Sequence, residues 1–333
     1  MGSLPSPPRP VTPPPSPENS TSNYQVFGSF CPRDQLPNTN RSNSIDSYNP
    51  SNNTWSHITS IPGLLENYVL KGFAMVSLRD SIYVIGGRLC HKETAQGSQD
   101  SDDYAEEDVK VLPVVLCFNV GSNQWSESCA PLGTPRYDFA CSICENKMYL
   151  RGLSSAEVYD PEPDIWAPLP NMSILRYKCV GVTWQGKFYV VGGFAEREDS
   201  DPGLFMVLRS SADVMWPLDV PPNQIVTMNG RLFRCGDCLN ARKGHTEVYD
   251  GVNMIWNELD GSERALNVDW RQNQRLYLPM APIGTHLYFL TGCRTAGDSS
   301  RTMSRVHVFD TSAAASKTWR SFEPMEEEGE RAL

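Results

Sequence analysis

The chain has 333 residues, of which 40% are hydrophobic, and its formal net charge is −10. This acidity argues against nucleic acid or an anionic membrane as the main partner, because binding to phosphates needs a basic surface. No apolar stretch approaches the roughly 18 residues that a membrane-spanning helix needs. Ten cysteines are scattered singly through apparent strands, which indicates free thiols in a reducing compartment, so we expect the cytoplasm or the nucleus.

The chain begins with a proline-rich segment, residues 1–23, that holds almost nothing able to build a core. Its composition predicts a disordered tail that favours polyproline II, without the basic and apolar regions of a secretory signal. Gly2 fits the loose pattern for N-myristoylation, but an unmodified, disordered start that happens to begin with glycine is the favoured explanation. The folded part is therefore expected to span residues 24–333.

From there on, an aromatic residue precedes a tryptophan five times at a nearly constant distance. The distance is seven residues in four cases and ten in the last. The pairs are Tyr48 and Trp55, Phe118 and Trp125, Tyr159 and Trp166, Tyr249 and Trp256, and Phe309 and Trp319. Repetition at about 50 residues indicates one supersecondary unit that is stacked several times.

Three apolar runs before these pairs end in Gly-Gly or Thr-Gly. Two of them close on paired glycines, Gly86 with Gly87 and Gly192 with Gly193. The unit is predicted to contain four strands: strand a, strand b ending in glycine, a variable loop, strand c ending in the aromatic residue, and strand d beginning at the tryptophan. Glycine permits close backbone packing at the end of strand b, and the aromatic pair buries a large area between sheets.

These motifs resemble the Kelch repeat, most closely that of plant kelch proteins, many of which carry an N-terminal F-box. The segments YVIGG with YNPSNNTW and YVVGG with VYDPEPDIW carry the resemblance, which covers residues 24–333. It implies an all-β fold, a propeller of four-stranded blades around a channel, as in galactose oxidase. Six tryptophans, Trp216 included, predict six blades. Their approximate bounds are residues 24–62, 68–132, 137–171, 177–220, 223–260 and 275–325.

Two departures from the repeat predict irregularities. Blade four lacks an aromatic residue before Trp216, and the preceding turn is short, so strand c or d is expected to be distorted or absent. Blade one begins at strand b, so its strand a has to come from elsewhere. Residues 330–333 look like the start of such a strand, and we expect a short closing pairing or none, with an unpaired strand edge.

Metal chemistry is disfavoured by the placement of the possible ligands. A copper site needs converging imidazoles, whereas the histidines are isolated along the chain. They are His57, His91, His245, His286 and His307. Two CxxC pairs, at Cys141 and Cys235, place residues three apart on a strand, where they face opposite sides and cannot chelate together. We therefore expect no metal and no cofactor, with a metal-dependent kelch enzyme as the alternative.

The resemblance places partner binding at the loops. Kelch domains that grip peptides use arginines at the d–a loop and small polar residues in the b–c loop. An Arg-Tyr pair opens strand a of blades three and four, and an Asn-Tyr pair holds the matching place in blade two. The resulting candidates are Arg136, Tyr137, Arg176, Tyr177, Asn67, Tyr68, Ser44, Ser154, Ser155, Ser210 and Ser211, with Arg88 and Arg294 after the strand b glycine. A packing feature that recurs with the repeat would explain the Arg-Tyr pairs equally well.

Blade two also carries an acidic loop, residues 97–110, which is either a solvated loop or a shield for the arginines. Taken together, these features predict a monomeric, non-enzymatic module that binds a protein segment on its loop face. An alternative is a substrate-recognition subunit of a ubiquitin ligase that acts through a separate adaptor, since residues 1–23 are too short for an F-box.

Overall fold

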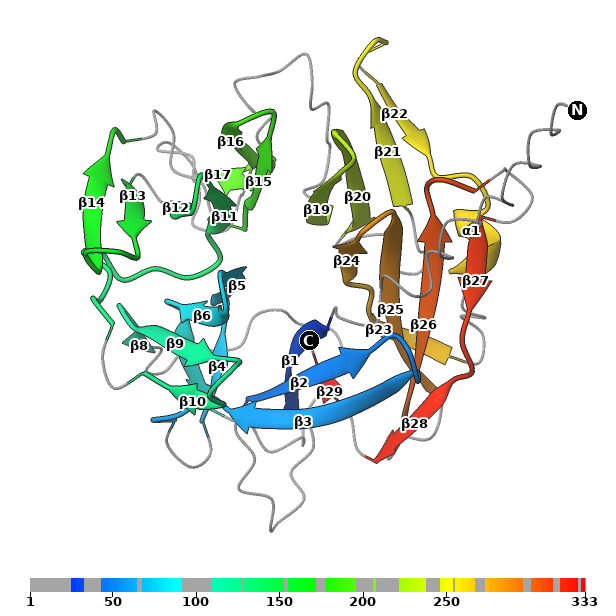
Figure 1. The fold of residues 1–333 in the computed structure, drawn as a ribbon, viewed down its shortest axis with the longest axis horizontal. Coiled ribbons are helices and arrows are strands. Elements are labelled where there is room, and N and C mark those ends of the chain that lie inside the picture. Colours follow the sequence, from blue (N-terminus) through cyan, green and yellow to red (C-terminus); the bar gives the residue numbers. More distant parts are fainter. Residues whose placement is uncertain are drawn as a thin grey trace, which may run out of the picture.

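The computed structural model is a β-propeller whose sheets stand around a central opening (Figure 1). The structure describes residues 25–32, 43–64, 68–91, 110–126, 129–152, 155–171, 178–195, 206–207, 222–237, 246–253, 255–266, 273–295, 301–313, 318–328 and 331–332. Among these residues the strands pair in antiparallel fashion, and none of the helical segments is long and apolar enough to cross a membrane. The all-β architecture that the repeat predicts is confirmed.

We number the sheets as blades in chain order. Blade one contains β1 (Val26–Pro32), β2 (Ser44–Asn49), β3 (Thr54–Ser60) and β29 (Arg331–Ala332). Blade two contains β5 (Ala74–Leu78), β6 (Ser81–Ile85), β9 (Val115–Asn119) and β10 (Gln124–Trp125), with a second sheet of β4 (Tyr68–Lys71), β7 (Arg88–His91) and β8 (Lys110–Val111). Blade three contains β11 (Ala140–Cys144), β12 (Lys147–Gly152), β13 (Ser155–Asp160) and β14 (Ile165–Leu169).

The remaining blades follow the same order. Blade four contains the pair β15 (Val180–Trp184) and β16 (Lys187–Val191) and the short pair β17 (Phe194–Ala195) and β18 (Met206–Val207). Blade five contains β19 (Pro222–Met228), β20 (Arg231–Asp237), β21 (Thr246–Asp250) and β22 (Ile255–Glu258), and α1 (Ser262–Ala265) follows it. Blade six contains β23 (Asn273–Tyr277), β24 (Met280–Ile283), β25 (His286–Thr295), β26 (Arg301–Asp310), β27 (Trp319–Ser321) and β28 (Met325–Glu328).

The aromatic-to-tryptophan spacing arises from cross-strand pairing between strands c and d. In all five pairs the aromatic residue lies directly opposite the tryptophan, with ring centroids between 4.9 and 5.3 Å apart. A seven-residue spacing is what a tight turn between two such partners requires. In blade six the turn is three residues longer, yet Phe309 still lies opposite Trp319.

The core lies between neighbouring blades. Tyr83 of blade two packs in one cluster with Leu150 of blade three, and Phe233 of blade five packs with Phe289 of blade six. A further cluster joins blades one and six, including Tyr48 and Tyr288. Each blade therefore has two faces to bury, which explains the large apolar residues on both faces of the middle strands.

Strands b and c of blades two, four and six continue beyond the glycines that were expected to end them. β7 with β8, β17 with β18, and the outer halves of β25 and β26 are paired past Gly87, Gly193 and Gly292. The prediction of a loop directly after glycine is therefore wrong for these blades. Residues 97–109 of the acidic loop lie outside the described residues.

The first and the last described strands are paired in blade one. Cys31 lies opposite Ala332 and Pro32 opposite Arg331, so β29 runs antiparallel to the end of β1, beside the C label in Figure 1. Within the described residues no strand runs along the inner edge of β1 at Val26–Ser29. Closure and blade number stay predictions, and the distortion predicted around Trp216 lies outside the described residues, as does the tail of residues 1–23.

Candidate functional site

Arg136 is the first of the predicted contact residues, and the structure buries it completely. Its side chain has 0% exposure and donates to the carbonyl oxygen of Thr134 at 3.3 Å, and to the carbonyl oxygen and Oγ of Ser155 at 3.3 and 3.1 Å. Its Nη2 lies 2.9 Å from Oε2 of Glu157, which is also buried. Burial lowers the pKa of Arg136, and the Glu157 carboxylate counteracts this.

These contacts give Arg136 a structural role. A partner cannot reach a guanidinium that is closed off on all sides, so the expectation that Arg136 contacts a partner does not fit its position. The packing around it is tight as well: Gly86 has φ +62, and a Cβ there would lie 2.5 Å from the carbonyl oxygen of Arg136. Ser155, another predicted contact, is one of the acceptors that hold Arg136.

The buried pair belongs to a pattern that the sequence analysis missed. In blades one, three, five and six a polar residue lies two positions before the strand c aromatic and is paired with another side chain, whereas blade two has Leu116 there. The pairs are Glu157 with Arg136, Glu247 with Arg234, Asp46 with His57, and His307 with Thr291 and Ser321. The aligned repeats contain this signal, since the same position of strand c carries a polar residue in four of them. A buried polar residue needs a hydrogen-bonding partner, so a paired residue could have been expected.

Tyr137 and Arg88, two other predicted contacts, lie together on the rim at the glycine end of strand b. The guanidinium carbon of Arg88 sits 4.9 Å from the centroid of the Tyr137 ring, and both residues are half-buried. This is a cation–π contact between blades two and three. On the neighbouring strand β4, Lys71 lies directly opposite Arg88 and is exposed.

A repeated backbone hydrogen bond connects the rim around Arg88 and Tyr137 to the next blade. Gly72, Asp138 and Lys178 each lie two residues before strand a of their blade, and all three have φ between 50 and 64. The amide of Asp138 donates to the carbonyl oxygen of Gly72 at 2.8 Å, and the amide of Lys178 donates to that of Asp138 at 2.7 Å. These two hydrogen bonds between residues with a left-handed backbone thus join three consecutive blades.

Charges gather around this backbone chain. The Asp138 carboxyl is near Arg88 and Lys178; burial raises its pKa, and the two cations oppose the rise. Gly72 makes room for it, because a Cβ there would lie 2.6 Å from Oδ1 of Asp138. We refer to Lys71, Arg88, Tyr137, Asp138 and Lys178 as the rim cluster. Among the described residues it contains three cations and one carboxylate.

The remaining candidates are placed as follows. Arg176, Tyr177, Ser154, Ser210, Ser211 and Asn67 lie outside the described residues. Arg294 lies on β25. Ser44 donates to the carbonyl oxygen of Phe30 at 3.5 Å. The predicted alignment of Tyr68 with Tyr137 is wrong. Strand a begins at Ala74 in blade two and at Ala140 in blade three, so Leu70 and Lys71 are the equivalents of Arg136 and Tyr137.

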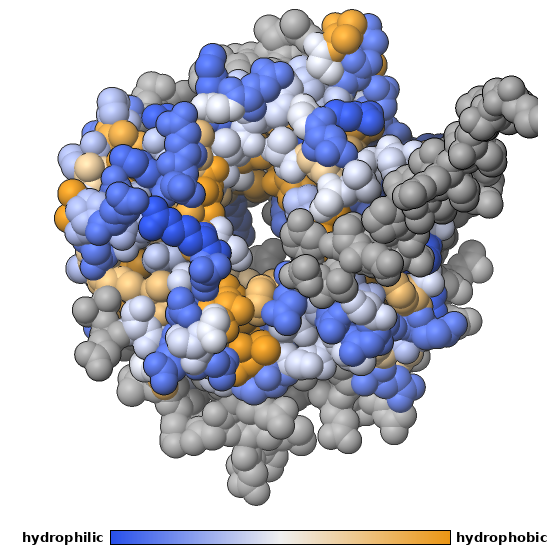
Figure 2. All heavy atoms as spheres, in the orientation of Figure 1, coloured by the Kyte–Doolittle hydropathy of each residue, from blue (hydrophilic) through white to orange (hydrophobic). Residues whose placement is uncertain are grey.

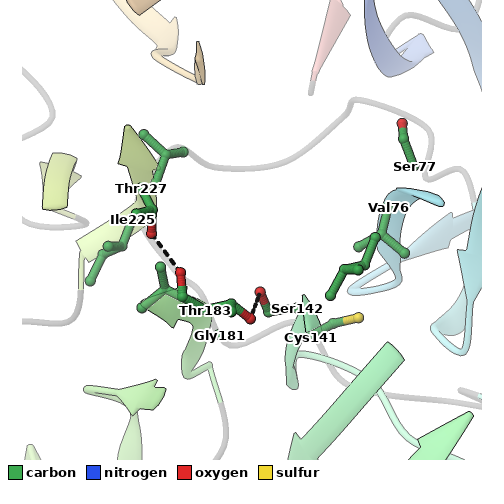
Figure 3. A pocket seen from close by; sticks show the side chains of 11 residues that line it. Val76, Ser77, Cys141, Ser142, Gly181, Thr183, Ile225 and Thr227 are labelled. Atoms are coloured by element: carbon green, nitrogen blue, oxygen red, sulfur yellow. Dashed lines mark hydrogen bonds between the residues drawn. The ribbon is translucent and has the colours of Figure 1, made fainter. Parts of the chain in front are cut away.

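A cavity of about 340 Å³ opens on the wall of the channel (Figure 3). It is lined by strand a of blades two to five, and the space-filling view shows hydrophobic residues around the central opening (Figure 2). Ser142 and Thr183 hydrogen-bond through their hydroxyl groups at 2.9 Å, and Thr227 donates to the carbonyl oxygen of Thr183 at 2.7 Å. These lining groups are hydroxyls, aliphatic side chains and one thiol, Cys141, which bear little charge at neutral pH.

The cysteines of the described residues behave as structural thiols. Burial raises the pKa of Cys141 and of Cys235 to about 12, which disfavours the reactive thiolate. Cys144 donates to the carbonyl oxygen of Gly186 and Cys235 to that of Leu278. No group of three or more His, Cys, Asp or Glu side chains among the described residues could hold a metal ion, and Cys238 lies outside them.

Comparison with known proteins finds kelch-repeat relatives. No family model matches the chain. Two F-box/kelch-repeat proteins of Arabidopsis thaliana are 31% and 32% identical over 166 residues, covering 46% and 45% of this chain and 41% and 43% of their own lengths. Kelch-like protein 35 of Mus musculus is 27% identical over 168 residues, 50% of this chain and 25% of the relative. This chain thus spans less than half of the relatives it matches.

Among solved structures, that of YjhT superposes with a TM-score of 0.50 at 12% identity, covering 84% of this chain and 91% of that chain. At this identity the likeness concerns the fold alone. The Kelch resemblance of the sequence is confirmed by the relatives, and the propeller architecture by the structural neighbour.

Proposed function

We propose that this protein is a non-enzymatic interaction module that binds a segment of a protein partner on the face where the rim cluster lies. The observation that carries the proposal is the contact of Arg88 with Tyr137. Arginine and tyrosine are enriched among the residues that dominate binding energy at protein interfaces, because both present a large, rigid surface with polar groups at its edge. The kelch-repeat relatives support the same class of function.

The channel supports binding better than catalysis. General acid–base catalysis needs a titratable group with a pKa near neutral pH, and nucleophilic catalysis needs an activated side chain. The described lining of the cavity offers hydroxyls that are bonded to the backbone or to one another, and a thiol with a raised pKa. All nine described cysteines are free thiols. This fits the reducing compartment, cytoplasm or nucleus, that we expect from the sequence.

Lysine-directed crosslinking of the tagged full chain to captured partners tests this function. We expect partner peptides on Lys71 and Lys178, and loss of the partner on Arg88→Ala and Tyr137→Ala. Arg79→Ala is the matched control, because Arg79 is exposed at the a–b turn of blade two, on the opposite end of strand b. Crosslinks confined to the a–b turns, with an unchanged partner list for both rim variants, would refute binding at this face.

A role in ubiquitin ligation is the second candidate, favoured by the F-box named in several relatives. In this case a separate adaptor would couple the module to the ligase, and the captured partner would accumulate when the proteasome is inhibited. The alternative of a metal-dependent enzyme is tested by metal analysis of the purified protein. Stoichiometric iron or copper would count against a non-enzymatic interaction module.

A further inference from the structure

We propose that the cavity on the channel wall binds an uncharged segment of extended peptide, which adds to the open edge of β15 by backbone hydrogen bonds. The inference goes beyond the proposed function, because the described lining of the cavity shares no residue with the rim cluster. A small molecule with two neighbouring amide groups shares this chemistry, and the experiment below distinguishes the two ligands.

The cavity is bounded by strand edges. Its described lining consists of two or three consecutive residues from each of β5, β11, β15 and β19. Successive side chains of a strand point to opposite faces, so consecutive residues line one cavity where the strand presents its edge. Among the described residues each of these strands is the last one of its sheet, and such an edge carries backbone N–H and C=O groups without a strand partner. The wall therefore offers backbone donors and acceptors.

The open edge of β15 is defined by a hydrogen bond from blade five. The hydroxyl group of Thr227 donates to the carbonyl oxygen of Thr183 at 2.7 Å, so this carbonyl points away from the partner strand β16 (Figure 3). In an antiparallel pair, residues two apart along a strand turn their N–H and C=O groups to the same side. The N–H and C=O of Gly181 therefore also lie on the open edge, where an extended peptide can pair with both.

The neighbouring edge, that of β11, is closed at the same level. A Cβ at Gly181 would lie 2.7 Å from both the backbone nitrogen and the carbonyl oxygen of Cys141. The missing side chain thus lets the backbone of blade four lie directly against that of blade three. This contact covers the backbone of Cys141, so the added segment pairs with β15 and not with β11.

The described lining favours a ligand without charge. Its one ionisable group is the thiol of Cys141, which burial keeps protonated by raising its pKa to about 12. The hydroxyl groups of Ser142 and Thr183 share one hydrogen bond of 2.9 Å, which leaves one of their two protons to donate to a ligand. A charged side chain would lose hydration here without gaining an ionic partner, which is unfavourable.

The size of the cavity limits the length of the segment. Three residues of one strand edge span about 10 Å, and a volume of about 340 Å³ lies at the lower end of the range for ligand pockets. Val76, Ile225 and Val226 add aliphatic surface to the lining. We therefore expect a segment of about three residues with small aliphatic side chains.

A series of blocked tripeptides tests the inference on the purified full chain, with binding measured by saturation-transfer NMR. The first peptide is valine-alanine-valine with an acetyl and a methylamide end. Glutamate or lysine replaces its alanine in two others, and two more are N-methylated, one at the alanine and one at both valines. We expect the first to bind and the two charged peptides to bind about tenfold or more weakly. At least one methylated peptide should lose binding to a similar degree, because methylation removes a backbone donor.

Ser77→Glu and Ser56→Glu are a matched pair of variants that locate the site. Both serines are exposed on strands, but Ser77 lines the cavity on β5, whereas Ser56 lies on β3, at the outer edge of blade one. With a carboxylate at the cavity, the affinity ratio of the lysine peptide to the glutamate peptide should rise about tenfold over the ratio in Ser56→Glu. Thermal unfolding checks that both variants fold, and the peptide series on the unchanged chain does not depend on them.

The inference is overturned if the neutral peptide does not bind, if the charged or both methylated peptides bind as tightly as it does, or if the two variants show the same affinity ratio. Acetylvaline methylamide is the last probe. If it binds as tightly as the tripeptide, the cavity is a site for a small diamide and not for a peptide segment. None of these results bears on the rim cluster, which crosslinking through Lys71 and Lys178 tests separately.

Discussion

At the scale of single residues, the structure separates two arginines that look alike in the sequence. Arg136 is enclosed and paired with Glu157, whereas Arg88 lies half-buried on the rim with its guanidinium over Tyr137. A buried guanidinium is tolerated only with a carboxylate partner and further acceptors, and Arg136 has both. Its contribution is therefore to the fold, while Arg88 can contribute to binding.

The Arg136 pair leads to a first prediction. Glu157→Gln removes the partner charge and leaves a buried guanidinium uncompensated, which should lower the free energy of unfolding by about 3–5 kcal/mol. Urea unfolding followed by tryptophan fluorescence measures this. The control is Glu162→Gln, which breaks an exposed pair with Arg79 and should cost at most about 1 kcal/mol. Equal effects of the two substitutions would contradict the structural role of Arg136.

Lys178 carries a second prediction. Its backbone has φ +52, which costs a residue with a side chain roughly 1–2 kcal/mol and costs glycine nothing. Lys178→Gly should therefore raise the free energy of unfolding or leave it unchanged. Lys187→Gly is the control, since Lys187 lies within strand β16, where glycine should destabilise by about 1 kcal/mol. A clear destabilisation by Lys178→Gly in thermal unfolding would refute this account.

At the scale of the elements, the pair of strands c and d with its two stacked aromatic residues is the unit of the fold. The tryptophans also connect neighbouring blades: Nε1 of Trp166 donates to the carbonyl oxygen of Ala130, and Nε1 of Trp125 to Oγ1 of Thr59. Tyr159 adds a hydrogen bond from its hydroxyl to Asp164 at 2.6 Å. The same residues thus set the register within a blade and its contact with the next.

These buried phenols predict a loss of stability at high pH. Burial raises the pKa of Tyr48 and Tyr159 well above the ordinary value near 10, and it also raises the pKa of Tyr83, Tyr249 and Tyr288. The unfolded chain releases these protons near pH 10 and the folded chain does so only at higher pH. The stabilisation is therefore complete below pH 10 and is lost progressively above it, by up to about 1.4 kcal/mol per pH unit for each phenol.

Urea unfolding at pH 9, 10 and 11 measures this slope, and absorbance at 295 nm counts the phenols that ionise in the folded state. Tyr159→Phe should be less stable at pH 7, because it loses the bond to Asp164, but should show a shallower decline above pH 10. A free energy of unfolding that is constant from pH 9 to 11 would show that the phenols are accessible to water in the folded state.

At the scale of the whole molecule, the pairing of β1 with β29 brings the first described strand to the last. Only two residues of each strand take part, Cys31 with Ala332 and Pro32 with Arg331, so the pairing is short. Blades one and six are also joined through apolar packing around Tyr48 and Tyr288. The packing buries far more apolar area than two backbone pairings supply, so it should dominate the stability of this junction.

Deletion of residues 331–333 tests this balance. The loss should be modest, about 1–2 kcal/mol, because it removes few hydrogen bonds and little apolar area. Hydrogen exchange should speed up at the amides of β1 while those of β20 and β21 in blade five stay protected. Global unfolding of the shortened chain would instead show that the strand pairing is what holds blade one in place.

The sequence by itself determined the repeated unit, its strands and the aromatic pairs, because each of these depends on residues close together along the chain. The seven-residue spacing is a local property of two paired strands and a turn, and the paired glycines mark a local left-handed backbone. Only the tertiary structure decided which polar residues are buried and which form the rim. Arg136 and Arg88 are both candidates in the sequence, yet one is enclosed and the other lies half-buried on the rim. Burial depends on the side chains that the adjacent blade presents, and no single repeat contains that information.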